Sequence, residues 1–436
     1  MSFDLPDLPE GWTFLPLDHC AVPGSISYGV VQPGSPVASG VPIIRVNNFS
    51  DTRLDLSDVM HIAPEVEAKY GRTRLTGGEV LLTLVGSVGR VAEVPKACAG
   101  FNVARAVGVI KPANGIAAKW IAICLRSPLS QQLLGSRANT TVQTTINLKD
   151  VRALPVPIPP LAERTLISDF IAALDDRIAL LRETNATLEA IAQALFKSWF
   201  VDFDPVRAKQ QGLPPAGMDE ATAALFPDSF EKSVLGLVPK GWHMATLIDS
   251  FEINPSRTLK RGAVGPYLDM ASLATSGHCV EPPIQREFGS GTKFQNGDTL
   301  LARITPCLEN GKSAFVDFLT DDQVGWGSTE FIVLRPKAPL PEYLGYLLCR
   351  HPPFREHAIH SMAGTSGRQR VQSDVLSRYP FVLPSNDVAQ AFAAIISSVQ
   401  RSIAGNHSQA QTLATLRDTL LPRLISGQLR LPEALP

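Results

Sequence analysis

Apolar residues recur in alternating steps of four and three along residues 161–204, a stretch that contains no Pro and no Gly. This spacing is the a/d pattern of a coiled coil, in which a narrow apolar seam is buried against a second helix. The pattern predicts one long helix from Leu161 to Asp204. Its seam positions are Ile167, Ile171, Leu174, Ile178, Leu181, Asn185, Leu188, Ala192, Leu195 and Trp199.

The same steps recur near the C-terminus, with each seam position 225 residues after its counterpart. Two helices with one pattern in one chain are expected to pair with each other. The second set of seam positions is Phe392, Ile396, Val399, Ile403, Asn406, Ala410, Leu413, Arg417, Leu420 and Leu424.

The polar seam residues indicate the direction of pairing. Antiparallel helices would place Asn185 opposite Asn406, whereas parallel helices would leave each amide facing an apolar residue. An unpaired buried amide costs about 1–3 kcal/mol. We therefore predict an antiparallel pair. In that register Arg417 faces Leu174, and we expect its guanidinium to extend outward to solvent.

The helices are the end of a longer internal repeat. Gly11-Trp12 has a counterpart in Gly241-Trp242, and the strand-like run 78–83 has one in 297–302. Short runs rich in Val, Ile and Thr, separated by Gly and Pro, precede each helix and predict strands. The runs with the strongest pattern are 80–85, 91–94, 105–110, 299–304, 313–318 and 331–335, and each half also has a short predicted helix, at 117–126 and 341–350.

These patterns predict a mixed α+β chain with a pseudo-twofold repeat. Two globular strand-rich domains would be separated by two long antiparallel helices. We expect domain one at 1–160, the first long helix at 161–205, a Gly/Pro-containing linker at 206–225, domain two at 226–384 and the second long helix at 385–436.

Composition narrows the function classes. The chain has 436 residues, 44% of them apolar and 19% charged, and a formal net charge of −1, so a basic global field does not mark it as a nucleic-acid binder. The six cysteines lie far apart with no Cys-x-x-Cys, which argues against zinc and against a disulfide framework. No run is long and apolar enough for a membrane span, and the acidic N-terminus is unlike a signal peptide, so we expect a cytoplasmic protein.

Catalytic and cofactor motifs are not convincing. Residues 310–313 (NGKS) resemble the end of a phosphate loop, but Pro306 stands where that loop needs Gly. Residues 351–354 (HPPF) resemble an amino-methyltransferase motif with the wrong first residue. His357 and His360 lack a third nearby metal ligand. The sequence thus predicts a protein without an active site or a metal of its own.

Polar, basic segments precede both long helices, at 136–145 and 364–370. Arg, Asn and Gln make bidentate contacts with guanine and adenine edges, and hydroxyl groups bind phosphates, so these segments fit DNA, with a solvated loop as the alternative. The strongest candidates are Arg137, Asn139, Thr140, Thr141, Gln143, Arg368, Gln369 and Arg370, and the weaker ones are Arg45, Asn47, Asn48, Arg90, Arg303 and Lys312.

Several blocks together resemble the specificity subunit of type I restriction-modification systems. They are Pro-Lys-Gly-Trp at 239–242, Gly-Asp-x-Leu-Leu at 297–301, the run LPVPIPPLAE at 154–163 and the run LFKSWFVDFDPV at 195–206. Their order, duplicated with two long helices, is specific, and it covers essentially the whole chain.

The resemblance implies two target-recognition domains, each of which reads half of a split, asymmetric DNA site. Helices of about 40 residues at about 1.5 Å per residue would set a separation of about 60 Å. Two methyltransferase subunits would dock on the helical parts and methylate adenine, and restriction-translocase subunits would join them. S-adenosylmethionine, ATP and magnesium would be bound by those partners, and this chain would hold no cofactor.

The second copy departs from the pattern, because residues 421–425 (LPRLI) replace the Phe-Lys-Ser-Trp-Phe block. Pro422 should end or kink the second helix early, which would make the two docking surfaces unequal. Two other functions stay open: a methyltransferase or nuclease with fused recognition domains, and a scaffold that does not bind DNA. The first needs a catalytic domain for which no stretch remains, and the second predicts no sequence-dependent DNA binding.

Overall fold

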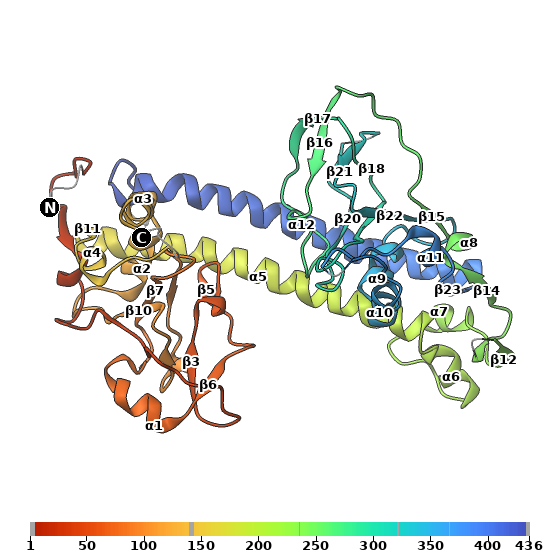
Figure 1. Cartoon of the computed structure of the whole chain (residues 1–436), viewed down its shortest axis with the longest axis horizontal. Coiled ribbons are helices and arrows are strands. Elements are labelled where there is room, and N and C mark those ends of the chain that lie inside the picture. The colour runs from red at the N-terminus through yellow and green to blue at the C-terminus, as the bar shows by residue number, and fades with distance from the viewer. Residues whose placement is uncertain (1–4, 139–143, 235, 321, 366, 433–436) are drawn as a thin grey trace. The chain divides into compact units, whose positions relative to one another are not determined.

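A computed structural model describes residues 5–138, 144–234, 236–320, 322–365 and 367–432 (Figure 1). The chain forms two compact units: unit 1 is Met1–Ala179 with Gln411–Pro436, and unit 2 is Leu180–Ala410. Each unit combines one strand-rich head with a portion of both long helices, α5 (Leu161–Phe200) and α12 (Asn386–Ile425). This architecture confirms the predicted α+β class and the two long helices.

The two helices pack antiparallel, and the predicted register is confirmed. In unit 2, the Asn406 amide Nδ2 donates to Oδ1 of Asn185 at 2.9 Å, and Asn185 Nδ2 donates to the Ile403 carbonyl at 2.9 Å. The antiparallel register that sets Asn185 opposite Asn406 also sets Trp199 opposite Phe392, and the centroids of these two rings lie 5.5 Å apart. All predicted seam residues are buried or half-buried, so the four-three spacing identified the face that each helix buries.

The predicted end of α5 at Asp204 is wrong. The helix stops at Phe200, and Phe203 adopts φ 56°, a left-handed conformation that cannot continue it. A separate helix, α6 (Asp204–Gln210), follows with Pro205 in its first turn. The predicted linker region therefore contains α6 and α7 (Glu220–Ala224), and the Lys209 ammonium donates to the Ala223 carbonyl at 3.0 Å.

The expectation that Pro422 ends α12 early is also wrong, because the helix continues to Ile425. A proline removes one hydrogen bond from a helix, and near the last turn that loss is small. Buried Leu424 and Ile425 hold the final turn in the core of unit 1. Packing thus outweighs the local preference.

The heads repeat one topology. Unit 1 has a sheet of order β2-β10-β7-β8, and unit 2 has its counterpart, β15-β22-β19-β20. A second sheet, β6-β3-β9, corresponds to β17-β16-β21, and each contains one parallel pair, β3 with β9 and β16 with β21. In both units a two-stranded sheet, β1-β11 or β14-β23, leads into the long helix. The internal repeat read from the sequence therefore extends to strand order.

The strands of unit 1 are β1 (Thr13–Pro16), β2 (Ser27–Tyr28), β3 (Val41–Ile44), β4 (Phe49–Ser50), β5 (Arg53–Leu54), β6 (Met60–Ile62), β7 (Val80–Thr83), β8 (Val91–Glu93), β9 (Asn102–Val103), β10 (Val107–Ile110) and β11 (Pro155–Ile158). Its short helices are α1 (Pro64–Glu67), α2 (Ala118–Arg126), α3 (Pro128–Arg137) and α4 (Leu148–Arg152).

The strands of unit 2 are β12 (Phe230–Ser233), β13 (Gly236–Pro239), β14 (His243–Thr246), β15 (Phe251–Ile253), β16 (Val264–Leu268), β17 (Ile284–Glu287), β18 (Thr292–Phe294), β19 (Thr299–Ala302), β20 (Ser313–Phe315), β21 (Gly325–Gly327), β22 (Phe331–Pro336) and β23 (Pro380–Leu383). Its remaining helices are α8 (Leu247–Ser250), α9 (Leu344–Arg350), α10 (Pro352–His360) and α11 (Ser373–Ser377).

Candidate nucleic-acid interface

In the first head, the loop after β3 carries three of the predicted residues. Asn48 is 2% exposed; its Oδ1 accepts from the Arg45 backbone N–H at 2.9 Å, and its Nδ2 donates to the carbonyls of Asp55 and Asp58 at 3.1 and 2.9 Å. These hydrogen bonds give Asn48 a role in holding the loop, so we leave it out of the interface. Asn47 is exposed, and Arg45 lies 3.5 Å from the carboxylate of Asp58.

Arg90 lies beside the same loop. Its Nη1 donates to the Phe49 carbonyl at 3.0 Å, and its side chain is exposed. The structure thus places Arg90 beside the loop that carries Arg45 and Asn47. Arg137 lies at the end of α3, 3.5 Å from the carboxylate of Asp150. The negative charge of Asp150 offsets the positive charge of Arg137. The other predicted residues of this segment, Asn139, Thr140, Thr141 and Gln143, lie outside the described residues.

In the second head, two of the predicted arginines lie beside the carboxylate of Glu330. Arg370 makes a two-pronged contact with it, Nε at 2.9 Å and Nη2 at 2.6 Å, and Arg303 Nε lies 4.0 Å away. The hydrogen bond from Arg370 holds the pKa of Glu330 below its usual value. Arg303 also donates to Oε1 of Gln372 at 3.0 Å. Since Arg370 is engaged in this pair, it is a weaker base-reading candidate than the sequence indicated.

Arg368 is exposed at the tip of this loop. Gln369 is fixed by its backbone, whose N–H donates to Thr305 Oγ1 at 3.1 Å and whose carbonyl accepts from the Thr305 N–H at 3.1 Å. Lys312 is the last residue of the neighbouring segment 303–312, and its Nζ donates to the Met270 carbonyl at 2.8 Å. The two loops therefore form one polar surface, on which Arg368 is the most accessible predicted residue.

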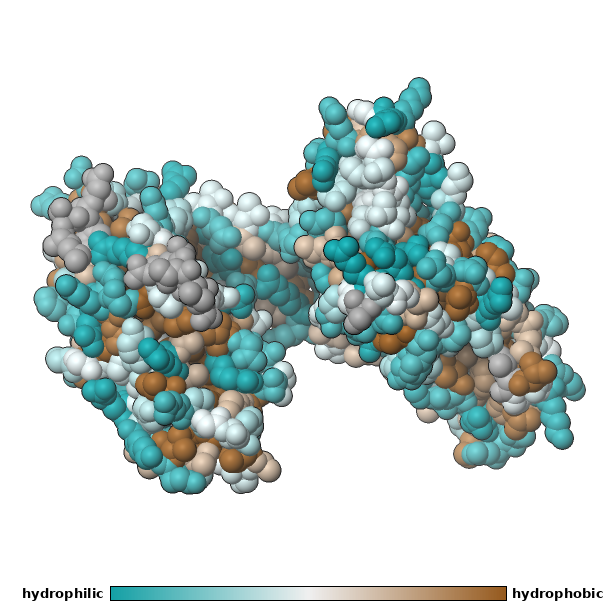
Figure 2. Space-filling model, in the orientation of Figure 1, coloured by the Kyte–Doolittle hydropathy of each residue, from teal (hydrophilic) through white to brown (hydrophobic). Residues whose placement is uncertain are grey.

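Sequence reasoning missed a basic and aromatic face on the sheet β17-β16-β21-β18. The exposed Arg286 guanidinium lies over two rings, 4.8 Å from the centroid of Tyr267 and 5.8 Å from that of Trp326. Lys293 lies 4.8 Å from the ring centroid of Phe288. Figure 2 shows hydrophilic atoms gathered over the end of unit 2 that β16 and β17 form. Because side chains alternate between the two faces along a strand, these side chains lie on the same face of the sheet. The strand pairing that brings them together joins segments that are far apart in the sequence.

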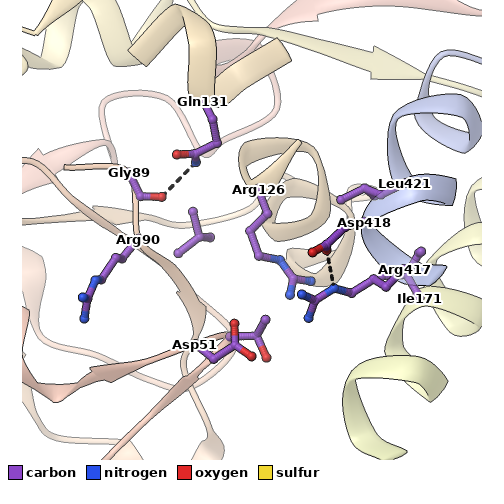
Figure 3. A pocket seen from close by; sticks show the side chains of 11 residues that line it. Asp51, Gly89, Arg90, Arg126, Gln131, Ile171, Arg417, Asp418 and Leu421 are labelled. Carbon is purple, nitrogen blue, oxygen red and sulfur yellow. Dashed lines mark hydrogen bonds and ion pairs between the residues drawn. The ribbon is translucent and has the colours of Figure 1, made fainter. Parts of the chain in front are cut away.

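A charged pocket of about 210 Å³ borders the first head, where Arg90, Arg126 and Arg417 line it with Asp51 and Asp418. Figure 3 shows Arg126, from α2, and Arg417, from α12, with their guanidinium groups turned toward each other. The expectation that Arg417 extends to solvent is wrong: its side chain is 13% exposed and donates to Asp175 Oδ1 and Asp418 Oδ1, both at 2.8 Å. Burial lowers its pKa, but these hydrogen bonds outweigh burial and raise the pKa above its ordinary value.

Comparison with known proteins finds similar proteins in both sequence and fold. Residues 37–190 match the family model described as the type I restriction modification DNA specificity domain. The EcoBI specificity subunit of Escherichia coli is 32% identical over 198 residues, which cover 43% of this chain and 42% of that protein. The HindI specificity subunit of Haemophilus influenzae is 26% identical over 338 residues, covering 67% of this chain and 72% of that protein.

The chain thus resembles the specificity subunits of type I restriction-modification systems. Its fold is shared with the crystal structure of the S subunit from M. genitalium, which it matches with a TM-score of 0.52 at 13% identity over 97% of this chain and 98% of the other. The match to EcoBI spans less than half of that relative's length.

The chain has an apolar groove in each unit, at equivalent positions of the repeat. The groove of unit 1, about 210 Å³, is lined by Phe14, Ser127, Leu129, Pro155, Pro422 and Ile425. The groove of unit 2, about 240 Å³, is lined by Phe196, Phe200, His351, Pro353, Pro380 and Val382. Ser127, Leu129, Pro155 and Ile425 correspond to His351, Pro353, Pro380 and Phe200 in the repeat, so the grooves share a place while differing in side chains.

Within the residue ranges that the structure describes, no cluster of three or more His, Cys, Asp or Glu side chains could hold a metal ion. His357 instead packs on the ring of Tyr379, with centroids 5.1 Å apart. None of the helices that the structure describes combines the length and apolar character needed to traverse a bilayer.

Proposed function

We propose that this chain reads a split, asymmetric DNA sequence for a type I restriction-modification complex. Each head would recognise one half-site. The proposal rests mainly on the duplicated head, whose strand order recurs in the two units, in a chain that resembles type I restriction-modification specificity subunits. The polar loops carry exposed side chains, the basic Arg90 and the amide Asn47 in one unit and the basic Arg368 in the other, that suit base edges and phosphates.

Each head with its loops corresponds to one target-recognition domain, at 1–160 and 226–384. The regions 161–205 and 385–436, which contain the long helices α5 and α12, act as spacers. We assign no chemistry to this chain: adenine methylation and DNA cleavage would be carried out by partner subunits. S-adenosylmethionine, ATP and magnesium would be bound by those partners, in the cytoplasm where the DNA lies.

The two apolar grooves support the choice of partner. A surface present twice in a repeated chain fits two copies of one protein, and two methyltransferase subunits satisfy that requirement. Restriction-translocase subunits would join this assembly. The unequal side chains, Pro422 and Ile425 in one groove against Phe196 and Phe200 in the other, predict unequal affinities for the two copies.

The assignment of the second head is tested with Arg368→Ala. The variant chain is assembled with its methyltransferase subunits, and methylation is measured on DNA libraries in which either half-site is randomised. If Arg368 reads a base, discrimination at one position of one half-site falls by about 10- to 100-fold, the effect of losing a bidentate contact of about 1–3 kcal/mol. The other half-site keeps its preference.

Lys232→Ala is the matched control, since Lys232 is an exposed cation of unit 2 on the separate hairpin of β12 and β13. It should leave both preferences unchanged. A uniform loss across all sequences would assign Arg368 to a phosphate instead of a base. Wild-type methylation without sequence preference would refute the proposed function itself.

A further inference from the structure

The first head contacts the long helices through two different kinds of surface. Toward the end of the helix pair, apolar residues of the head pack on Ile167 and Ile171 of α5 and on Leu421, Leu424 and Ile425 of α12. One turn farther along, at Asp175 and Arg417, the contact becomes ionic. Apolar packing is non-directional and tolerates small rotations, whereas charge-assisted hydrogen bonds fix distance and angle.

Asp175 joins three elements at one carboxylate. Its Oδ2 accepts from Nη1 of Arg126, the last residue of α2 in the head, at 2.8 Å. Its Oδ1 accepts from Nη1 of Arg417 in α12, also at 2.8 Å. The side chains of Asp175, Arg417 and Arg126 are 11, 13 and 20% exposed, so water screens these contacts weakly. Any tilt of the head about its apolar contact would lengthen at least one of them.

A polar connection of the same kind occurs in unit 2. Arg350 ends α9, the repeat counterpart of α2, and its Nε lies 3.7 Å from Oε1 of Glu189 in α5, which also accepts from the Tyr346 hydroxyl at 2.5 Å. Toward α12, Gln400 Nε2 donates to Asp317 of the head at 2.6 Å. The second head is thus hydrogen-bonded to both helices directly, whereas the first head is bonded to α5 and reaches α12 through Asp175.

The exposed ion pairs of the first head differ from this arrangement. Lys119 of α2 and Asp169 of α5 lie 3.3 Å apart, with side chains 42 and 66% exposed. Such a pair contributes little and reorients easily. It joins the same two elements as Arg126 and Asp175 do, and it therefore offers a matched comparison.

We propose that Asp175 is a positioning residue that fixes the angle at which the first head meets the helix pair, and thereby the half-site spacing that the subunit accepts. The proposal rests on the proposed function, because spacing has meaning only for a two-part DNA site. One added base pair moves a half-site by about 3.4 Å and rotates it by about 35°. A head held at one angle rejects such a change, and a head free to tilt accepts part of it.

The test uses the full complex with its methyltransferase subunits. The natural site and its spacer are first read from methylated adenines in the source genome. Methylation rates are then measured on duplexes with that spacer and with spacers one base pair shorter or longer. We expect Asp175→Asn to lower the preference for the natural spacer by about tenfold or more, the effect of weakening one charge-assisted hydrogen bond, while methylation at the natural spacer is largely kept.

A second variant, Arg417→Leu, guards against misfolding. It places an apolar residue at a seam position, which coiled-coil packing accepts. It removes the contact of Asp175 with α12 and the ion pair of Arg417 with its exposed neighbour Asp418, and it leaves the contact of Asp175 with Arg126 of the head in place. It should relax spacer preference in the same direction. The control Asp169→Asn, which breaks the exposed pair with Lys119, should retain the wild-type preference.

Unchanged spacer preference in Asp175→Asn and Arg417→Leu would overturn the inference, and so would an equal loss of methylation at every spacing, which destabilisation alone would cause. Spin labels introduced as non-natural amino acids at exposed Glu65 and Ala173 give a readout that is independent of DNA. The distance distribution between them should broaden in Asp175→Asn. If it broadens while the wild-type complex shows no sequence preference, the proposed function fails and the positioning role of Asp175 stands.

Discussion

The asparagine pair in the helix seam allows a quantitative prediction. Asn406→Leu removes the donor that satisfies Asn185 Oδ1, and Asn185→Leu removes the partner of Asn406 Nδ2. A fully buried amide without its partner costs about 1–3 kcal/mol, and since both residues are half-buried we expect the low end, about 1 kcal/mol, for each single variant. The double variant removes both polar groups together and should be neutral or stabilised.

The assay is a double-mutant cycle on the full chain, followed by far-ultraviolet circular dichroism during thermal unfolding. For a domain of about 150–250 residues, 1 kcal/mol shifts the midpoint by about 2–4 °C. Each single variant should therefore lower the transition of unit 2 by that amount, and the double variant should recover it. If the double variant loses the sum of the two single losses, the amides are not coupled and the reasoning is refuted.

Three further predictions follow from the heads. Gly29→Ala should destabilise unit 1 by about 1–3 kcal/mol or more in urea unfolding, because an added Cβ would lie 2.0 Å from a backbone carbonyl oxygen; Gly135→Ala, with open space around it, should be neutral or stabilising. Cys307 should react fastest with iodoacetamide at about pH 8, as mass spectrometry would show, because it is only half-buried. Cys20, Cys98, Cys124 and Cys349 are buried, and burial raises the pKa of the half-buried Cys279 to about 12. Arg370 lowers the pKa of Glu330, so the ion pair stabilises the fold fully at pH values above 4.5, the ordinary pKa, and this stabilisation is lost as the pH falls through the lowered pKa. The free energies of unfolding of wild type and Arg370→Ala, measured in urea, should therefore differ at neutral pH and converge in acid.

Helix direction and register were predictable from sequence, since both follow from local spacing and from the need to pair two buried amides. The repeat was predictable as well, because matched short blocks preserve their order. The end of α5 was not predictable. Phe203 adopts a left-handed conformation there, and a phenylalanine in the sequence does not indicate such a conformation. The continuation of α12 past Pro422 depends on burial of Leu424 and Ile425, a tertiary effect.

The candidate interface was predictable only as a set of segments. Residue type identified both Arg368 and Asn48 as candidates, yet Arg368 is exposed and Asn48 is buried with its amide bonded inside the loop. Partners of Arg370 and Arg417 lie 40 and 242 residues away, beyond the reach of any local pattern. A signal for the polar connections did exist, because Arg126 and Arg350 end equivalent helices of the repeat, but it became meaningful only with Asp175 and Glu189 placed beside them.

Sequence reading by this chain is tested most directly by single-molecule mapping of methylated adenines in the source organism, with and without its gene. We expect one two-part motif with a fixed spacer to lose methylation when the gene is deleted and to regain it when the gene is restored. An unchanged methylation pattern after deletion would contradict the assignment of this chain as the reader of that DNA sequence.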